Sequence, residues 1–426
     1  MKPICLSLLV LTGTLFAVRG EEFRTDINPA LLYYRSFLLV QNPMSEADRD
    51  YLASKEGKEN KLPERFGQVV AGYDSQFILV RRATRATVPC DWGIDYYDGP
   101  NIMLPYLARA KAVAQAAQLR AMWDLQRGRQ DDACNDLLAA FVLARNAGND
   151  GLLISALVQN AMEAIAYTTI AQNFGEFSPE TLKQLADGFD AAPARHTVAN
   201  CIQTEKFGIH DWMVNKILEI QKAHPDDDAK VMAGFHDCGV VTTLDSLGYT
   251  NFWPQLVAAS GGTSEGVLKL LRECETLFPR IARIMALPQP EYEIEAKQFL
   301  SDIHDSQNPF ITVFFNFYFT GFPPNGGLIG DIPVRAKEFK AQAQQAMVRA
   351  AVEYKLNGEA GLKSVKDPFG AGPFAFRRFV FKGVDRGFEL KSAYTGADAP
   401  FRMIFVEKPG PAFQITGPGA GKAIDK

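Results

Sequence analysis

The chain has 426 residues, with 45 Lys and Arg against 49 Asp and Glu, and a formal net charge of −4. A mildly acidic chain without a basic block lacks the electrostatic footprint of a nucleic-acid-binding protein. It also lacks the polybasic patch of a protein that binds anionic membranes. At about 100–200 residues per domain, the length allows two or three domains.

Residues 1–20 have the layout of a secretory signal peptide. Lys2 supplies a positive start, residues 4–16 supply an apolar run, and Val18 and Gly20 are small residues at the −3 and −1 positions of a cleavage site. The alternative is a retained membrane anchor, but the run is shorter than the roughly 20 residues that span a bilayer. We expect an exported protein, periplasmic or extracellular, without a transmembrane segment after processing.

Five cysteines follow the signal peptide, and their spacing contains no C-x-x-C pair: Cys90, Cys134, Cys201, Cys238 and Cys274. A zinc ribbon or a dithiol redox motif is therefore not expected. In an oxidising compartment an odd number leaves at least one cysteine unpaired or paired between molecules, and the sequence leaves the pairing open. Most of the five are predicted to be small buried apolar residues.

Residues 21–358 are predicted to form a helical domain. It begins at Asn28-Pro29, where Asn can cap a helix and Pro is tolerated in the first turn. Residues 30–40 are apolar nearly all round, which is typical of a buried helix. Arg35 in its middle would then need a carboxylate or several carbonyl groups as partners.

The centre of the chain is an acidic and aromatic loop, residues 90–100, followed by two amphipathic helices. The helices are predicted over residues 102–127 and 131–146, with Gly128 between them, and alanines recur along both at steps of three and four. So many small residues on the facing stripes predict a close approach of the two helices. Further helices are predicted over residues 152–173, 193–222 and 332–357.

Two later stretches differ from this helical pattern. Residues 309–319 are dense in aromatic side chains, too short to span a bilayer, and are interpreted as a buried segment rather than a membrane-surface wedge. Residues 359–408 are predicted to form a small β-unit, because 374–381, 387–394 and 401–406 alternate apolar and polar residues between Gly-rich turns. The alternation changes parity near Arg377, which suggests a β-bulge. The Gly/Pro-rich tail, residues 409–426, is expected to be disordered.

Part of the two helices predicted over residues 102–127 and 131–146 resembles a tetratricopeptide (TPR) repeat. Gly128, Gln130, Ala133, Leu137 and Ala140 have the spacing of the second half of that motif. The first half departs from the motif, and the pattern does not recur about 34 residues later. The resemblance implies a single TPR-like hairpin. The expected fold is therefore mainly α, with stacked antiparallel helical hairpins (TPR-like or α-solenoid-like) and a small C-terminal antiparallel β-unit.

Two further resemblances concern larger parts of the chain. Residues 367–374 followed by 388–398 are similar to the C-terminal strand–turn–strand unit of type II secretion pseudopilins, although the pilin methylation helix is absent. This implies a β-appendage and not a pilus subunit. Taken whole, the chain resembles a family of exported, mostly helical bacterial proteins, through residues 28–34, 90–93, 98–100 and 367–369. That family brings no known activity.

The loop after Cys90 is the predicted ligand-binding surface. Trp92, Tyr96 and Tyr97 could stack on a sugar or a peptide, with Asp95 and Asp98 beside them. Arg35 is the sixth predicted ligand-binding residue. Acidic side chains in this loop could also offer oxygen ligands to Ca²⁺, but the spacing is not that of an EF-hand. Acidic residues beside Gly and Pro more often cap turns. No metal site and no cofactor are predicted.

A second hypothesis is an enzyme that uses paired carboxylates. Glu163 lies on a helix apolar enough to be interior, so its carboxylate should be paired, with Arg35 or Arg109, or lie in a cleft. Glu205 is the second candidate and Asp91 the third. Two such groups about 5–9.5 Å apart would suit glycoside hydrolysis. The alternative interpretation is a structural ion-pair network.

The sequence therefore supports two hypotheses of function. The first is an exported helical scaffold that binds a protein, peptide or glycan of the cell envelope. The second is a hydrolase of envelope or extracellular polysaccharide. Two carboxylates within about 10 Å across one pocket would favour the hydrolase. Carboxylates each held by an arginine, with no cavity nearby, would favour the binding protein or a structural role.

Overall fold

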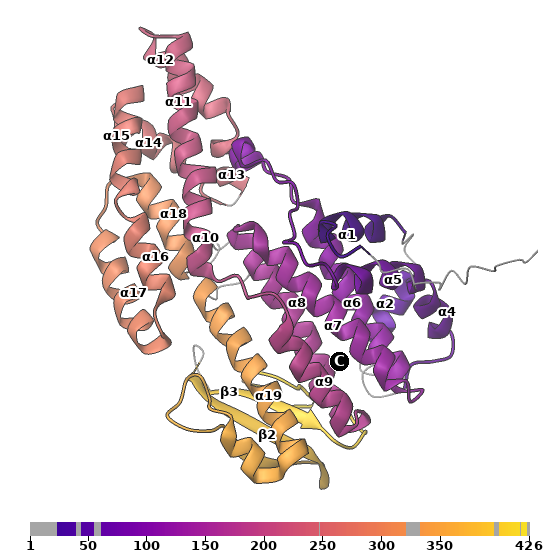
Figure 1. The fold of residues 1–426 in the computed structure, drawn as a ribbon. Coiled ribbons are helices and arrows are strands. Elements are labelled where there is room, and N and C mark those ends of the chain that lie inside the picture. The colour runs from indigo at the N-terminus through magenta and orange to yellow at the C-terminus, as the bar shows by residue number, and fades with distance from the viewer. Residues whose placement is uncertain are drawn as a thin grey trace, which may run out of the picture.

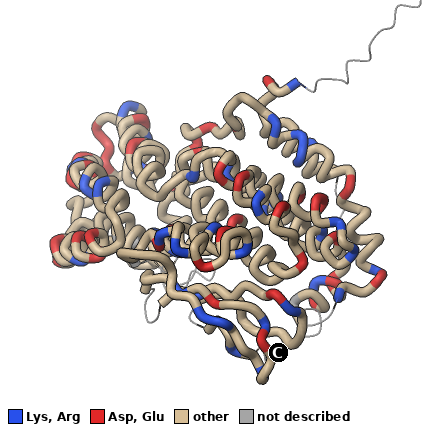
Figure 2. The backbone as a smooth tube through the Cα atoms, turned by 60° about the horizontal axis from the view of Figure 1, so that its bottom comes forward, with Lys and Arg blue, Asp and Glu red and all other residues tan. Residues whose placement is uncertain are grey.

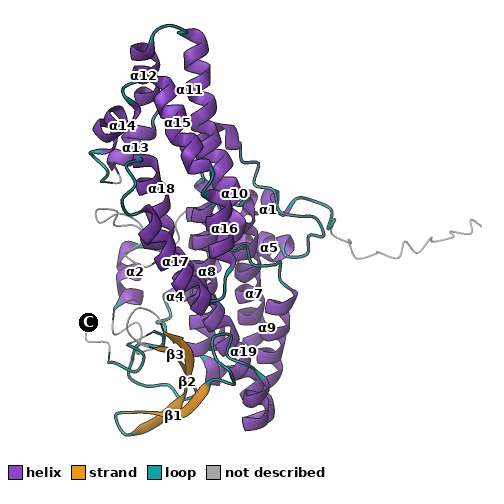
Figure 3. Cartoon of the chain, turned by 90° about the vertical axis from the view of Figure 1, so that its left-hand side faces the viewer, coloured by secondary structure: helices purple, strands orange, loops and turns teal. Residues whose placement is uncertain are grey.

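The protein is mainly helical, with one small antiparallel sheet near its C-terminus (Figures 1 and 3). The computed structural model describes residues 24–39, 44–54, 61–246, 248–320, 333–395, 400–417 and 419–423. The predicted signal peptide lies outside these ranges. Within them, no helix combines the length and the apolar character that crossing a bilayer requires.

The N-terminal part of the fold is built around two long helices. It contains α1 (Pro29–Leu38), α2 (Glu46–Ala53), α4 (Phe66–Ala71), α5 (Asp74–Ala83), the 3₁₀ helix η1 (Tyr96–Asn101), α6 (Pro105–Leu125) and α7 (Gln130–Ala147). α6 and α7 form the predicted hairpin, and Gly128 turns between them with φ 74°. Ala110, Ala117, Ala133 and Ala140 are all buried. The prediction of two closely packed helices here is confirmed.

The remaining helices follow α7 and form the larger part of the molecule. They are η2 (Gly148–Asp150), α8 (Leu153–Gln172), η3 (Phe174–Glu176), α9 (Pro179–Ala191), α10 (Val198–Glu205), the π-helix η4 (Lys206–Asp211), α11 (Trp212–Ala223), α12 (Asp228–Asp237), α13 (Val240–Ser246), α14 (Phe252–Ser260), α15 (Ser264–Glu275), α16 (Phe278–Ala286), α17 (Gln289–Ile303), α18 (Pro309–Thr320) and α19 (Val334–Ser364). α11 to α18 lie together at one end of the molecule, and the sheet lies at the other (Figure 1). The α-helices range from six residues in α4 to 31 in α19. A regular solenoid repeats helices of similar length, so the predicted solenoid-like stacking is not confirmed.

Two hydrophobic cores meet at α7. One core lies among α1, α4, α5 and α6 and receives Leu143 and Ala147 from α7. The other extends from α8 to the sheet and receives Leu137 and Phe141. Because α7 carries apolar residues on both faces, it is buried between the two cores, and the whole helical region is continuous through it.

The aromatic run at residues 309–319 is helix α18. Phe310 and Phe315 are fully buried, and their rings lie 5.4 Å from Phe252 and 5.2 Å from Phe278 respectively. The prediction of a buried segment is confirmed.

The sheet has the order β1-β2-β3, with β1 (Ala375–Phe381), β2 (Val384–Thr395) and β3 (Pro400–Val406). The register of β1 shifts between Phe379 and Val380, two residues beyond the predicted bulge. Phe388 and Phe405 pack against Phe174 of η3, with ring centroids 5.6 Å and 5.3 Å apart. One face of the sheet therefore belongs to the helical core.

The C-terminal tail differs from the expectation of disorder. In its described part, residues 409–417 and 419–423, Phe413 and Ala420 are buried with Phe379 and Ile404 of the sheet. Isolated β-bridges join Met403 to Thr416 and Phe413 to Ala423. A few apolar side chains among the Gly and Pro residues cover the second face of the sheet, and the tail is ordered by that burial.

The cysteines are free thiols in the described chain. Cys90, Cys134, Cys201 and Cys274 are buried and Cys238 is half-buried. Burial raises the pKa of the Cys90 thiol to about 12. The prediction that most are small buried residues is confirmed.

Lys and Arg are interspersed with Asp and Glu along the backbone (Figure 2).

Candidate ligand-binding site

The first half of the predicted loop is fixed to helix α1. The Asn28 side-chain amide donates a hydrogen bond to the Asp91 carbonyl oxygen at 2.7 Å, and the Asp91 backbone N–H donates to Asn28 Oδ1 at 3.1 Å. The Tyr34 hydroxyl donates to the Trp92 carbonyl oxygen at 3.2 Å. The resemblance segment at residues 28–34 thus holds the loop in place.

Trp92 lies in the core rather than on a binding surface. Its side chain is 6% exposed, its ring lies 4.2 Å from that of Tyr106, and its indole N–H donates to the Asn146 carbonyl oxygen at 2.8 Å. An indole enclosed in this way is not available to a ligand.

The acidic residues of the loop form turns. Asp91 Oδ1 accepts the Gly93 N–H at 2.9 Å, and Asp95 Oδ1 accepts the Tyr97 N–H at 2.9 Å. Asp98 is exposed. No three His, Cys, Asp or Glu side chains in the described chain are grouped as metal ligands. These contacts are the turn-forming alternative to a Ca²⁺ site.

Glu163 is enclosed by two arginines, neither of which is a predicted partner. Its Oε1 lies 2.6 Å from Arg145 Nε, and its Oε2 accepts a hydrogen bond from Arg195. All three side chains are at least nine-tenths buried. Arg35 and Arg109, the predicted partners, are exposed, because the solvent side of α1 carries Arg35 and that of α6 carries Arg109. The prediction that Arg35 is buried is therefore wrong.

The second half of the loop reaches the surface beside η4 and α11. Tyr97 is 79% exposed, and its ring lies 5.6 Å from that of Phe207. Together with Tyr96 and Trp212 these rings form a concavity of about 260 Å³, here called the aromatic pocket. Its remaining lining is polar and comes from α11: Asn215, Lys216 and Glu219. Sequence reasoning found Tyr96 and Tyr97 but missed Phe207 and Trp212, which lie about 110 residues further on.

A glycine sets the distance between the loop and α11. Gly99 has φ 58°, a conformation that residues with a Cβ rarely adopt. A Cβ atom at this position would lie 2.4 Å from the Trp212 ring. Gly99 therefore allows the loop to pack directly on Trp212, and this contact shapes the aromatic pocket.

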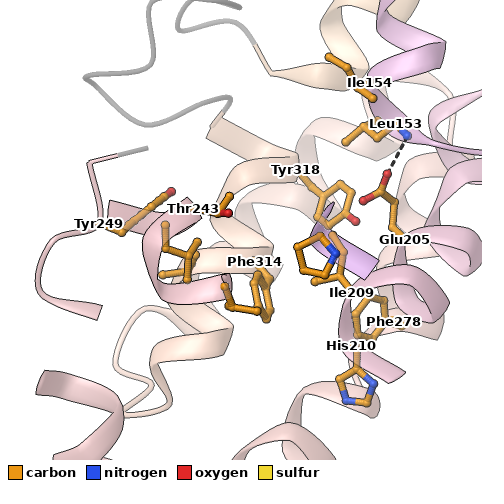
Figure 4. Close-up of a pocket in the computed structure, with 14 residues that line it drawn as sticks. Leu153, Ile154, Glu205, Ile209, His210, Thr243, Tyr249, Phe278, Phe314 and Tyr318 are labelled. Atoms are coloured by element: carbon orange, nitrogen blue, oxygen red, sulfur yellow. Dashed lines mark hydrogen bonds between the residues drawn. The ribbon is translucent and has the colours of Figure 1, made fainter. Parts of the chain in front are cut away.

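A second concavity lies on the inner side of the π-helix η4. It has a volume of about 270 Å³ and is lined by α8, α10, α13, α16 and α18. Its walls are mostly apolar and include Phe278, Phe314 and Tyr318 (Figure 4). Glu205 contributes the one carboxylate among its lining residues. This space is called the Glu205 cavity below.

Glu205 is held by the first turn of α8. Its Oε1 accepts the Leu153 N–H at 2.7 Å. Burial raises the pKa of the carboxyl to about 7; the Leu153 hydrogen bond opposes this, and the charge of Asp150 adds to it. Within the described ranges, Glu205 has no salt bridge.

Asp150, which sequence reasoning missed, is the carboxylate next to Glu205. It accepts the Leu152 N–H at 2.8 Å and the Ser155 hydroxyl at 2.5 Å, and the Tyr106 hydroxyl also donates to it. Burial raises its pKa. Leu152 has no capping side chain of its own, so these two carboxylates cap the helix.

The three predicted catalytic residues occupy different environments. Glu205 lines a cavity, Glu163 is enclosed by Arg145 and Arg195, and Asp91 is exposed on the loop.

Comparison with protein-family models, with curated proteins and with solved structures gave no match for the chain.

Proposed function

We propose that the protein is an exported binding protein of the cell envelope, and that its aromatic pocket binds a glycan. The observation that carries this proposal is the exposed ring of Tyr97, which lies beside Phe207 in a concavity with polar side chains on one side. Exposed apolar side chains gathered at one place are typical of binding surfaces.

The composition of the pocket suits a sugar ring. A pyranose has C–H faces that pack on aromatic rings, and hydroxyl groups that need hydrogen-bond partners when water is displaced. Tyr97, Phe207 and Trp212 supply the rings. Asn215 supplies an amide that both donates and accepts, and the Lys216–Glu219 pair, with Nζ and Oε2 3.0 Å apart, supplies one donor and one acceptor.

The binding test uses the full mature chain on a glycan array, followed by calorimetry with the best glycan. Tyr97→Ala should lower the affinity about tenfold or more, since truncation of a central aromatic anchor costs about 2 kcal/mol or more. Met103→Ala is the matched control, because Met103 follows the same loop and is 81% exposed. Unchanged affinity in Tyr97→Ala, or binding of peptides but no glycan, would reject the glycan site.

Export rests on the N-terminal pattern of residues 1–20. Mass spectrometry of the protein purified from its own cells tests it. A chain that begins at Glu21 supports export and a chain that keeps residues 1–20 opposes it.

A polysaccharide hydrolase is the second candidate, favoured by the raised pKa of Glu205 next to Asp150. A carboxyl group with a pKa near 7 suits a general acid. Release of reducing ends from an envelope polysaccharide, abolished by Glu205→Gln, would support the hydrolase. Glycan binding without turnover leaves the binding protein.

A further inference from the structure

We propose that the Glu205 cavity is a second binding site, which takes a small hydrophobic amine as its ammonium ion. The site is distinct from the aromatic pocket: the π-helix η4 lies between them, with Phe207 in the aromatic pocket and Ile209 in the cavity.

The carboxylate of Glu205 has capacity for a cation. An ionised carboxylate offers about four lone-pair sites, and the Leu153 N–H uses one of them on Oε1. The carboxylate lies beside Tyr318 at the wall of the cavity (Figure 4). A buried carboxylate without a charged partner is costly, and an ammonium ion would supply both the opposite charge and a charge-assisted donor.

The aromatic walls favour the same charge. Phe278, Phe314 and Tyr318 line the cavity, and the faces of aromatic rings attract cations. The apolar remainder, which includes Val313 and Leu244, suits a hydrocarbon chain. A volume of about 270 Å³ is close to the lower limit of about 300 Å³ for small-molecule sites, so the ligand is small.

The groups around Glu205 oppose an anion and leave room for one positive charge. Asp150 of η2 interacts electrostatically with Glu205, and so does Cys201 of α10. Both side chains become negatively charged when they lose a proton. Tyr318 of α18 is a third such side chain. His210 of η4 is occupied elsewhere, with Nδ1 2.7 Å from Asp211 Oδ1 and Nε2 2.9 Å from the Leu271 carbonyl oxygen.

Three more titratable side chains belong to these surroundings, and one of them, His196, interacts electrostatically with Asp150. Lys206, next to Glu205 in the chain, has its Nζ on Asp211 at 2.7 Å and on Glu275 at 3.1 Å. The phenol of Tyr249 also lines the cavity. A fatty acid in this space would bring a further negative charge to Glu205 and Asp150 and would be repelled.

The test compares n-octylamine with 1-octanol, which has nearly the same shape and no charge. Binding to the full mature chain is measured by calorimetry at pH 6 and pH 8. Octylamine should bind about tenfold tighter than octanol at pH 8. Its affinity should rise from pH 6 to pH 8, because Glu205 has a pKa of about 7 and loses its proton over this interval, while the affinity for octanol should stay constant.

Glu205→Gln should remove the preference for the amine and its pH dependence, and should leave octanol binding unchanged, which also shows that the cavity is intact. Glu359→Gln, at a carboxylate 77% exposed on α19, is the matched control and should behave as the parent protein. If Glu205→Gln does not fold, Phe278→Leu should weaken both ligands together. Equal affinities for amine and alcohol, no binding of either, tighter binding of octanoic acid, or an amine preference that survives in Glu205→Gln would overturn the proposal.

Discussion

The Glu163 carboxylate neutralises two guanidinium groups in the interior of the protein, those of Arg145 and Arg195. Glu163→Gln leaves both positive charges buried without their counter-charge. We expect the free energy of unfolding to fall by about 3–5 kcal/mol, the cost of breaking a buried ion pair. Urea denaturation followed by circular dichroism measures it.

Glu359→Gln is again the control, since an exposed substitution changes stability by about 0.5 kcal/mol or less. A loss in Glu163→Gln as small as that of the control would mean that the three buried groups do not contribute to folding as a unit.

The raised pKa of Glu205 makes stability depend on pH. The unfolded carboxyl titrates near its ordinary value of 4.5 and the folded one near 7. Below pH 4.5 both states hold the proton; as pH rises from 4.5 to 7 the unfolded state releases it first, so stability falls. At about 1.4 kcal/mol per pKa unit, the loss is about 3 kcal/mol.

Denaturant titrations at pH 4.5 and pH 7.5, without ligand, measure this loss. Glu205→Gln has no proton to release at this position and should show a decrease smaller by about that amount. An equal decrease in the parent protein and in Glu205→Gln would contradict the assignment of the raised pKa.

The burial of a single residue could be predicted from the sequence where it depends on the apolar pattern of the helix that carries the residue. Glu163 lies on a helix with apolar neighbours on most sides, and its burial follows from that. Its partners do not, because Arg145 is on the preceding helix and Arg195 follows α9. Asp150 was missed because its partners, Tyr106 and Ser155, are brought to it by the fold.

The contact of η1 with α11 is the element-scale feature that forms the aromatic pocket. Gly99→Ala would place a Cβ atom 2.4 Å from the Trp212 ring and also strain the backbone. We expect glycan affinity to fall about tenfold or more, since the rings of the pocket would be displaced. Calorimetry with the glycan measures it.

Gly93→Ala is the control for a methyl group that meets no neighbour. Gly93 is in the same loop with φ 69°, and a Cβ atom there would meet nothing within 4 Å. It should cost about 1–2 kcal/mol of stability through its backbone and leave glycan affinity unchanged, whereas Gly99, with ψ −133°, has a conformation nearly confined to glycine and should lose more. Equal affinities for the two variants would exclude the Trp212 contact as the determinant of the pocket.

Elements with strong periodicity were predicted best. The helices expected at 102–127 and 131–146 are α6 and α7 with ends displaced by three residues or fewer. The helix expected at 193–222 instead begins at Val198, after a capping box of Thr197 and Asn200. It then contains the π-helix η4. An apolar period fits a π-turn and an α-turn almost equally well over so few residues, so the irregularity has no clear sequence signal.

At the scale of the whole molecule, the sheet and the helices share one hydrophobic core. Phe388 of β2 is fully buried and packs on Phe174 and Tyr354. Phe388→Ala should lower the free energy of unfolding by about 3–5 kcal/mol. Hydrogen exchange should accelerate in α19, which carries Tyr354, as well as in β2, because the two unfold together.

Val380→Ala is the control on the same sheet, at a side chain 58% exposed, with an expected change of about 0.5 kcal/mol or less. Faster exchange in β2 alone after Phe388→Ala would show that the sheet unfolds independently of the helices.

The fold class was predictable because helical periodicity and strand alternation are both local patterns. The arrangement of the elements was not. Phe174 and Phe405 are adjacent in space but more than two hundred residues apart in sequence. The local sequence around each residue shows that it is apolar but does not show which distant segment it packs against.

The wide turn η4 holds one more residue per turn than the α-helices on either side of it. Deleting a single residue between Lys206 and Asp211 would let the segment wind as an ordinary α-helix, in which each residue turns the chain by about 100°. Because each residue of the wide turn rotates the chain less than that, the shortened segment would turn through about the same total angle. Glu205 and Trp212 would then keep their relative directions, and the extra residue of η4 widens the wall between the two concavities without setting the angle between them.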